Sequence, residues 1–360
     1  MALTADPRLR DVIARFQLSG EPVSASIVPG GHINESWRVE CRADSRVSTY
    51  LLQRLNPSVF PDPVAVMENI VRVTRHCAAR RSLVLRPTLG GGWWHRDEAG
   101  DCWRVYDFIE GAHVRERAES PALAREAAAA FGGFLRLMSD YDGPPLHETL
   151  PGFHDTAARF ACLEGAACRD PMGRLAEARP ELDAVLARRG LADVLPPLFA
   201  SRVLPRRIAH HDAKIANVLF DDAEETALAV IDLDTVMPGS ALYDFGDLVR
   251  SMVSATAEDE ADVARIRVRL PVFEALAQGY LAEAGAVLVP KERELLAFAG
   301  RLITLEQAVR FLTDHLEGDR YYRVARPGHN LDRARAQIAL LNSLVAHADE
   351  MDAIIARAAR

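Results

Sequence analysis

The sequence has few cysteines, and no two of them form a Cys-x-x-Cys pair. The five are scattered along the 360 residues: Cys41, Cys77, Cys102, Cys162 and Cys168. An odd, scattered set argues against a disulfide framework and against a zinc knuckle. We therefore expect a reducing compartment, in which thiols stay free.

The sequence also lacks a long apolar run. No stretch approaches the roughly 18 uncharged apolar residues that a membrane-spanning helix needs. The opening segment, MALTADPRLRDV, carries charges where a signal peptide has an apolar region. These absences predict a cytoplasmic protein without a membrane partner.

A dense block of basic residues is missing as well. The net charge is −8 with histidines neutral, and the Arg-Arg pairs at 80–81 and 206–207 stand alone. Such a balance argues against nucleic acid or an anionic membrane as the main partner. An anionic ligand would need a local cluster of charges or a metal ion. The composition leaves the oligomeric state open, and a monomer is compatible with it.

What the sequence does contain is a change of pattern near residue 110. Before this point, segments 25–41 and 48–56 have strand patterns, and segment 91–111 is typical of a hairpin. One helical pattern, at 63–81, lies among them. The pattern predicts a small unit rich in strands.

Beyond residue 111 the pattern is helical, apart from one strand pair. Apolar residues recur at helical spacing in segments 120–140, 156–168, 180–189, 259–285, 291–317 and 331–358. The strand pair, NVLFDD and TALAVID, is joined by an acidic turn. We therefore predict an α+β, bilobal chain: a strand-rich N-lobe at 1–106, a hinge at 107–112 and a mostly helical C-lobe at 113–360.

The stretch HHDAKIANVLF, residues 210–220, places an acid, a cation and an amide before a strand. Asp212 precedes the predicted hairpin, Asn217 begins its first strand and Asp232 ends its second. Because the two open ends of a tight hairpin are neighbours, these three side chains should converge. Two oxygen ligands with room for water suit Mg²⁺. A further acid beside them can accept a proton from a hydroxyl.

An Asp–x₄–Asn loop followed by a strand-end acid is typical of protein-kinase-like phosphotransferases. In that arrangement Asp212 is the catalytic base, and Asn217 and Asp232 hold Mg²⁺. Lys214 can neutralise charge on the γ-phosphate of ATP. An isolated Asp–x₄–Asn is more often a polar turn without chemistry, and it is the hairpin with Asp232 that favours a kinase. Asp244, in a stretch with the letters of the kinase metal motif, follows a loop, so we expect it to accept backbone N–H bonds from the catalytic loop.

Three further polar residues lie close to this motif. His210 and His211 have no third ligand at zinc spacing, so His210 is expected to support the loop backbone. Asp234 lies on the same side as Asp232 if the chain stays extended. Asp234 could then contact the substrate or a second metal ion, or face solvent.

The N-lobe offers weaker candidates for nucleotide binding. Gly30 and Gly31 could bring backbone N–H groups to phosphates, or simply form a turn. Where a kinase has a strand lysine, this sequence has Gln53 and Arg54. Arg54 could contact phosphates, with Glu68 on the following helix as an ion-pair partner, or it could be a surface arginine.

The adenine is expected along the backbone between the lobes, from Asp107 to Ile109. In a bilobal kinase this connecting segment passes beside the nucleotide. We therefore predict that these two residues take part in nucleotide binding.

Several segments resemble those of one family. They are GGHINESWRV, YLLQRLNPSVFPDPVAVMENIVRVTRH, WRVYDFIEGA, HHDAKIANVLFD, VIDLDTVMPGSALYDFGD and TLEQAVRFLTDHLEGDRYY. Together, from about residue 25 to 330, they resemble N-acetylhexosamine 1-kinases of the aminoglycoside-phosphotransferase superfamily. The resemblance implies a protein-kinase-like fold and a transfer from ATP, with Mg²⁺, to the anomeric hydroxyl of GlcNAc or GalNAc.

The resemblance also implies roles for residues outside the catalytic loop. It suggests that His32, Arg310 and Tyr321 reach the sugar. From the residues alone, Arg310 could instead form an exposed ion pair with Glu306, four positions earlier. His32 and Tyr321 could equally be turn and packing residues.

One departure from the family pattern bears on the acceptor. Ser251 stands where this family is expected to have an aromatic residue. Another small alcohol, such as a different sugar, homoserine, methylthioribose or an aminoglycoside, is the alternative acceptor. A non-catalytic, kinase-like nucleotide-binding module is a second alternative, against which the joint presence of Asp212, Asn217 and Asp232 argues.

Overall fold

The computed structural model of the chain describes residues 6–29, 33–78 and 83–360. Gly30, Gly31 and His32, which we predict to contact phosphates and sugar, lie outside the described residues. The chain divides into two compact units. One comprises Met1–Ala112, Tyr141–Leu150 and Ile231–Met237, and the other comprises His113–Asp140, Pro151–Val230 and Pro238–Arg360.

The first unit is built on an antiparallel sheet of five strands. In spatial order, these are β1 (Glu21–Ile27), β2 (Glu35–Ala43), β3 (Arg46–Arg54), β5 (Cys102–Asp107) and β4 (His95–Arg96). Alternate residues of the strands pack with helix α1 (Pro7–Ile13) in one apolar cluster, among them Val39, Leu52 and Val105. This alternation is the period that the sequence predicts for a sheet with two different faces.

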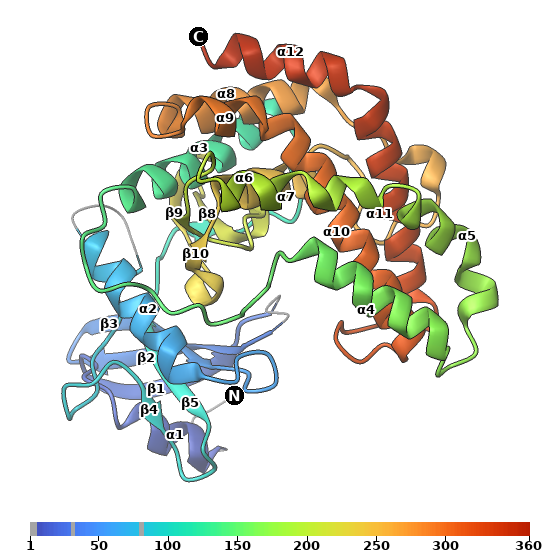
Figure 1. Ribbon diagram of the computed structural model, residues 1–360. Coiled ribbons are helices and arrows are strands. Elements are labelled where there is room, and N and C mark those ends of the chain that lie inside the picture. The colour runs from blue at the N-terminus through green and yellow to red at the C-terminus, as the bar shows by residue number, and fades with distance from the viewer. Residues whose placement is uncertain (1–5, 30–32, 79–82) are drawn as a thin grey trace. The chain divides into compact units, whose positions relative to one another are not determined.

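The opposite face of β5 carries two large side chains of a different kind. Arg104 and Tyr106 are each only 1% exposed. The Arg104 guanidinium lies 4.0 Å from the sulfur of Met67 on α2 (Pro63–His76). Helix α2, shown in blue in Figure 1, begins with Asp62 as N-cap and a proline in its first turn.

One buried amide ties two later segments of the chain to α2. The Nδ2 of Asn69 donates to the carbonyl oxygens of His147 (2.8 Å) and Val236 (3.1 Å). Its Oδ1 accepts a bond from the His147 N–H, at 2.8 Å. Asn69 thus contacts both segments, 141–150 and 231–237, that belong to the first unit although they follow it in the sequence.

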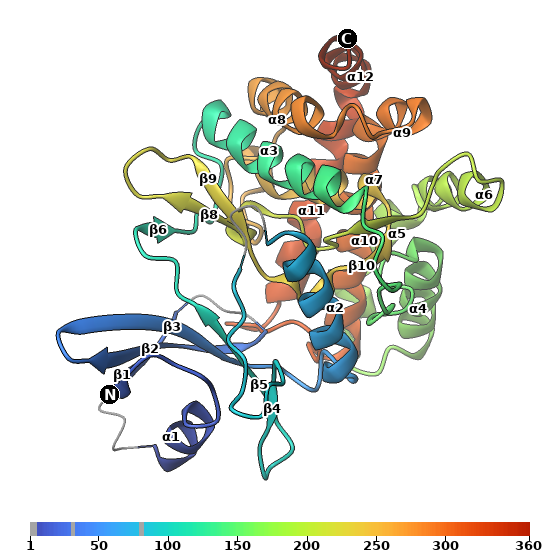
Figure 2. The ribbon, with the colours of Figure 1, turned by 90° about the vertical axis from the view of Figure 1, so that its left-hand side faces the viewer.

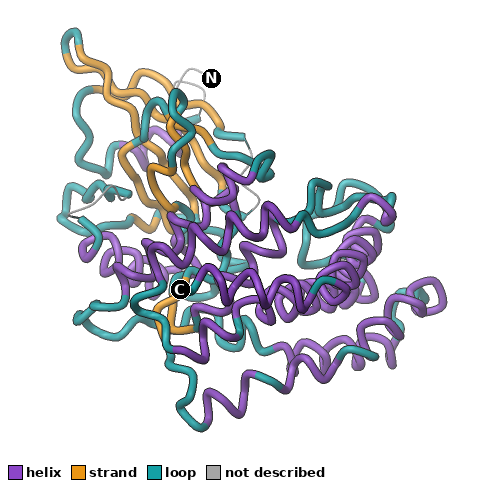
Figure 3. The backbone as a smooth tube through the Cα atoms, turned by 90° about the horizontal axis from the view of Figure 1, so that it is seen from above, coloured by secondary structure: helices purple, strands orange, loops and turns teal. Residues whose placement is uncertain are grey.

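The second unit is mostly helical. Its helices are α3 (Pro121–Met138), α4 (Thr156–Arg169), α5 (Leu175–Leu186), α6 (Leu195–Ala200), α7 (Ala241–Met252), α8 (Leu270–Ala284), α9 (Pro290–Glu294), α10 (Leu296–Glu317), α11 (His329–Ala346) and α12 (Ala348–Ala358). Short strands complete the chain: β6 (Ala112–His113), β7 (Arg207–Ala209), β8 (Val218–Asp221), β9 (Ala227–Val230) and β10 (Met237–Gly239). Figure 3 separates helices from strands by colour, and the α+β class predicted from the sequence is confirmed.

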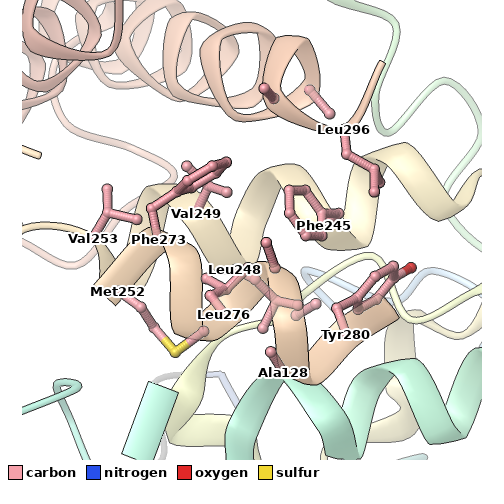
Figure 4. Packing of buried hydrophobic residues seen from close by; sticks show 14 of the residues in the cluster. Ala128, Phe245, Leu248, Val249, Met252, Val253, Phe273, Leu276, Tyr280 and Leu296 are labelled. Carbon is pink, nitrogen blue, oxygen red and sulfur yellow. The ribbon is translucent and has the colours of Figure 1, made fainter. Parts of the chain in front are cut away.

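Helices α3 and α8 pack closely along one another (Figure 2). A Cβ at Gly132 would lie 2.6 Å from the Tyr280 carbonyl oxygen, and one at Gly279 would lie 2.2 Å from that of Arg125. Both distances are shorter than a van der Waals contact, so only glycine permits this approach. Above the crossing, Phe245, Phe273 and their neighbours form the main core (Figure 4).

Two predicted helices differ from the observed ones. The 259–285 pattern begins as a helix only at Leu270, where a proline occupies the first turn. The 331–358 pattern is interrupted at His347, which has φ −110° and ψ 20°. Apolar periodicity continues across both points, so it does not reveal the breaks. Among the described helices, none is long and apolar enough to cross a membrane.

Candidate active site

The loop between β7 and β8 carries the predicted catalytic residues, and one buried acid holds its backbone. The carboxylate of Asp244 on α7 accepts the N–H of His210 with one oxygen and that of His211 with the other, both at 2.8 Å. This confirms the role predicted for Asp244. Burial raises the pKa of Asp244, and the nearby His210 and the two backbone bonds oppose that rise.

The side chains of His210 and His211 both pack against residues outside the loop. The His210 ring lies edge-on to Phe131 with centroids 5.2 Å apart, and its Nδ1 accepts the Asp212 N–H at 3.3 Å. His210 therefore supports the backbone as predicted. His211 has a left-handed φ of 67°, and its ring fills the space beside Gly239.

Asp212 is held by the two residues that the sequence motif places after it. The Nδ2 of Asn217 donates to the Asp212 backbone oxygen and to its Oδ2, both at 2.8 Å. The Lys214 Nζ lies 2.9 Å from the same Oδ2. Burial alone would raise the pKa of Asp212, but the Lys214 charge outweighs it, so this pKa lies well below its ordinary value. The carboxylate is therefore ionised at neutral pH, and its role as base stays a prediction.

A second acid and an arginine, which sequence reasoning did not single out, lie on α7 one turn beyond Asp244. The Nε of Arg250 donates to Asp247 at 2.6 Å, and another nitrogen of its guanidinium donates to Glu258 at 2.5 Å. Burial raises the pKa of Asp247, Arg250 opposes this, and the Asp212 charge adds to the rise. Asp247 therefore lies close enough to Asp212 to interact with it. The spacing of three from Asp244 places both acids on one helix face, a signal that the sequence did contain.

The strand pair β8–β9 forms as predicted, but the prediction that Asn217 begins its first strand is wrong, because Asn217 ends the 3-10 turn Ile215–Asn217 and β8 begins at Val218. Val218, which follows Asn217, pairs with Val230, so Asn217 and residue 231 leave the hairpin at the same end. The strand stops at Val230 and not at Asp232, because Asp232 adopts a left-handed conformation with φ 60° and ψ 58°. Asn217 and Asp232 belong to different compact units, and their meeting at a metal ion remains a prediction.

The assumption of an extended chain after Asp232 is wrong. Residues Leu233–Thr235 form a 3-10 turn, so Asp234 does not share a side with Asp232 by strand alternation. The Asp234 carboxylate is buried and accepts bonds from Arg104 and from Asn34, the latter at 2.5 Å. A contact between Asp234 and a substrate stays a prediction, and it would require one of these bonds to give way.

The candidate Arg54 lies at the end of β3 and is ion-paired on the sheet. It approaches Glu35 at 2.6 Å and Asp101 at 2.9 Å. Glu68 instead approaches Arg72 at 2.8 Å and His147 at 2.6 Å, so the predicted Arg54–Glu68 pair is wrong among the described residues. Arg54 keeps 30% of its side chain exposed, and phosphate binding by it stays a prediction.

Gln53 and Arg54 stand where a kinase has its strand lysine, but neither supplies the buried cation of this sheet. That cation is Arg104 on β5, and the side-chain oxygen of Gln53 accepts its Nε–H at 3.0 Å. The alternation in WRVYD, with Trp103 and Val105 on one face, could have placed Arg104 on the other face.

The predicted adenine-binding segment begins at the end of β5. Asp107 forms an ion pair with Arg86 at 2.5 Å, and its N–H donates to the Val84 carbonyl oxygen. The Phe108 N–H donates to the carbonyl oxygen of Thr49 on β3. A backbone N–H contact with adenine would therefore fall to Ile109 or a later residue.

Arg310 lies among three aromatic rings in the helical unit. Its guanidinium carbon is 4.9 Å from the ring centroid of Phe153 and 5.7 Å from those of Tyr321 and Tyr322. The structure thus brings together Arg310 and Tyr321, which the resemblance links to sugar binding. Such cation–π contacts hold the guanidinium in place, and one of its nitrogens also donates to the Gln307 side-chain oxygen at 3.4 Å.

The exposed Glu306–Arg310 ion pair, offered above as an alternative, is wrong because Glu306 is buried. Its carboxylate accepts bonds from His154 at 2.8 Å and from the Thr156 hydroxyl at 2.6 Å. His154 in turn stacks on Tyr243 with ring centroids 4.5 Å apart. These aromatic contacts join the surroundings of Arg310 to α7.

Comparison with known proteins agrees with this fold. Residues 24–286, more than half of the chain, match the model of the phosphotransferase enzyme family. The chain belongs to this family. As a family member, it has the kinase-like arrangement of a strand-rich unit and a helical unit.

Three solved structures are similar to the phosphotransferase over nearly its whole length. An aminoglycoside phosphotransferase from Alicyclobacillus acidocaldarius is 18% identical, with a TM-score of 0.56, and covers 98% of this chain and 95% of its own. An amicoumacin kinase in complex with AMP-PNP, Ca²⁺ and Ami is 16% identical, with a TM-score of 0.58 and 93% of each chain covered. A choline/ethanolamine kinase family protein from Mesorhizobium loti is 18% identical, with a TM-score of 0.54, and covers 98% of this chain and 96% of its own.

Proposed function

We propose that this phosphotransferase uses ATP and Mg²⁺ to phosphorylate a small neutral sugar, at the anomeric hydroxyl of an N-acetylhexosamine. The observation that carries the proposal is the cluster of Asp212, Lys214 and Asn217, joined by contacts of 2.8–2.9 Å. This cluster combines a proton acceptor, a cation and an amide oxygen, which are the groups that phosphoryl transfer to a hydroxyl requires.

The residues fit a magnesium ion by the chemistry of their donor atoms. The Nδ2 of Asn217 is committed to Asp212, which leaves the amide oxygen of Asn217 to face away from it. With the carboxylate of Asp232, this oxygen would hold Mg²⁺, which binds oxygen ligands and keeps several waters. When bound, the ion would neutralise charge on the phosphates of ATP.

Asp212 then acts as base toward the acceptor. As the new oxygen–phosphorus bond forms, the bond from the γ-phosphorus to the bridging oxygen of ATP breaks, ADP leaves, and the Asp212 carboxylate takes the proton of the attacking hydroxyl. The Lys214 ammonium, at 2.9 Å from Asp212, is placed to balance negative charge on the transferred phosphoryl group. An anomeric hydroxyl is more acidic than other sugar hydroxyls, so a carboxylate with a low pKa suffices.

The charge of the proposed base favours a neutral acceptor. The Asp212 carboxylate lies 2.9 Å from the Lys214 ammonium, which balances its charge. A polycationic aminoglycoside needs carboxylates that are not already neutralised. The rings around Arg310 likewise already hold a cation, which would repel a choline-like ammonium group.

The remaining contacts are assigned by the same proposal. The nucleotide would meet Gly30, Gly31, Arg54, Asp107 and Ile109. The sugar would meet the side chains of His32, Asp234, Arg310 and Tyr321, beside Asp212.

The test is a panel of acceptors incubated with ATP and Mg²⁺, with the products analysed by phosphorus NMR. GlcNAc or GalNAc should give a sugar 1-phosphate, and 1-O-methyl-GlcNAc should give none. Glucose should react more slowly, because it leaves the polar groups for the acetamide without partners. Phosphorylation of the 1-O-methyl sugar, or of spectinomycin or choline in preference to the sugars, would contradict the proposal.

A further inference from the structure

A buried ion pair joins the interior of the five-stranded sheet to the turn that follows Asp232. Its members are Arg104 on β5 and Asp234 in the 3-10 turn Leu233–Thr235, and each side chain is 1% exposed. The two residues are 130 positions apart in the sequence. The guanidinium of Arg104 also lies 5.2 Å from the ring centroid of Tyr106.

Neighbouring polar groups complete the hydrogen bonding of this pair. Asn34 donates its Nδ2 to the second Asp234 oxygen at 2.5 Å, and its Oδ1 accepts the Asn56 N–H at 3.0 Å. The Arg104 Nε donates to Gln53 at 3.0 Å. The pair is therefore fixed from β3, from β5 and from the segment that precedes β2.

Stability alone gives a weak reason for such a pair. A buried ion pair loses about as much in desolvation as it gains in attraction, and well-packed apolar residues are often as stabilising. The position of the pair suggests a different reason. Asp234 stands two residues after Asp232, whose backbone is left-handed, a conformation that is uncommon for non-glycine residues although aspartate adopts it more readily than most.

We propose that Arg104 is a positioning residue for the metal site: by holding Asp234, it fixes the turn from which Asp232 would bind Mg²⁺. The inference rests on the function proposed above, because it takes Asp232 as a metal ligand. It also gives the cation of this sheet a role that differs from phosphate binding. Partners behind metal ligands commonly set the orientation of those ligands.

The test measures ADP binding by calorimetry at increasing Mg²⁺ concentrations, together with melting temperatures. Arg104→Met should raise the Mg²⁺ concentration for half-maximal enhancement of ADP binding by about 10-fold or more. ADP binding without metal should change little. Arg104→Lys keeps the charge but cannot bond Asp234 and Gln53 in the same way, so it should fall between Arg104→Met and the unmodified protein.

Val105→Ala is the matched control. Val105 lies on the same strand, is 1% exposed and packs on the opposite face, in the cluster with Val39 and Leu52. Its truncation should lower the melting temperature and leave the Mg²⁺ requirement unchanged. A rise in the Mg²⁺ requirement of Val105→Ala equal to that of Arg104→Met would overturn the proposal, since any loosening of the sheet would then suffice.

A second variant keeps the test decisive if Arg104→Met does not fold. Asp234→Asn preserves the shape of the side chain and removes its charge, and it should also raise the Mg²⁺ requirement. The proposal would be wrong if Asp234→Asn and every folded Arg104 variant had a lower melting temperature but an unchanged Mg²⁺ requirement. The ion pair would then contribute only to stability. These binding data need no sugar, so an inactive sugar panel would remove the proposed acceptor and leave the positioning role intact. If Mg²⁺ does not affect ADP binding by the unmodified protein, both the proposed metal site and the positioning role of Arg104 would be wrong.

Discussion

The imidazole of His154 lies stacked on that of His211, with ring centroids 5.2 Å apart and ring planes inclined by 15°. His211 directly precedes the proposed base, and His154 follows Phe153, whose ring contacts Arg310. The stack therefore links the catalytic loop to the group of residues proposed to hold the sugar. Changes that move the His211 ring should disturb both.

Gly239→Ala should lower kcat while the protein remains folded. A Cβ at Gly239 would lie 2.3 Å from the His211 ring, so the ring must leave its place on His154. A displacement of about 1 Å next to a catalytic group can reduce the rate by about 100-fold. Steady-state kinetics and circular dichroism would test this. Gly190→Ala, where nothing lies within 4 Å of the added Cβ, is the control and should behave as the unmodified protein.

Asp212→Asn should reduce turnover by about 100-fold or more, the contribution expected of a positioned base. The amide keeps the size of the side chain, so ADP binding should change little, whereas loss of the charge that Lys214 and Asn217 stabilise should lower the melting temperature. Rapid-quench measurement of phosphate transfer, with ADP calorimetry beside it, separates the two effects. If the variant retained more than about a tenth of the activity, against the loss expected for a base, another group would have to accept the proton.

Asp244→Ala and Asp232→Ala should have different consequences. Removing the Asp244 carboxylate leaves the N–H groups of His210 and His211 without their acceptor, at about 1–3 kcal/mol for each. This variant should therefore unfold at lower temperature. Asp232→Ala should mainly raise the Mg²⁺ requirement for ADP binding. The assignments would be reversed if only Asp244→Ala needed more Mg²⁺.

Glu306 should contribute to the loss of stability in acid. Burial alone would raise its pKa, but His154, the Arg310 charge and Thr156 together lower it below the ordinary value. Because the folded-state pKa is lowered, the stabilisation is present above the unfolded-state pKa and is lost as the pH falls through the folded-state pKa. In urea unfolding between pH 7 and pH 3, Glu306→Gln should therefore lose less stability than the unmodified protein.

An exposed glutamate on the same helix provides the comparison for that measurement. Glu317 forms a surface pair with Arg169, and its side chain is 38% exposed. Glu317→Gln should follow the pH dependence of the unmodified protein, since surface pairs contribute little to stability. Parallel curves for Glu306→Gln and Glu317→Gln would rule out a special contribution from the buried carboxylate.

Features of the site encoded by short spacings could be predicted from the sequence. The five-residue separation of Asp212 and Asn217 is enough to bring the amide to the carboxylate, because one loop and one short turn connect them. The loop before Asp244 was enough to predict that this residue accepts backbone N–H bonds, although its neighbours have the letters of the kinase metal motif. The α+β class followed in the same way from local periodicity.

Contacts between distant segments could not be predicted in this way. Arg104 and Asp234 meet because an alternating strand directs the arginine to one face and a turn carries the acid back to it. The end of β9 at Val230 depends on the left-handed backbone of Asp232, for which an aspartate gives only a weak local signal. The stack of His154 on His211 also joins segments that are far apart in the sequence, so no local pattern predicts it.

The bonds of Asn69 limit how this chain can be divided. A fragment that stops at Ala112 would lack segments 141–150 and 231–237, and with them the carbonyl oxygens of His147 and Val236 that Asn69 contacts. The N-terminal unit is thus not a contiguous module that can be expressed alone or exchanged between homologues at a single crossover. A chimaera that keeps this amide satisfied would have to carry all three segments from the same parent.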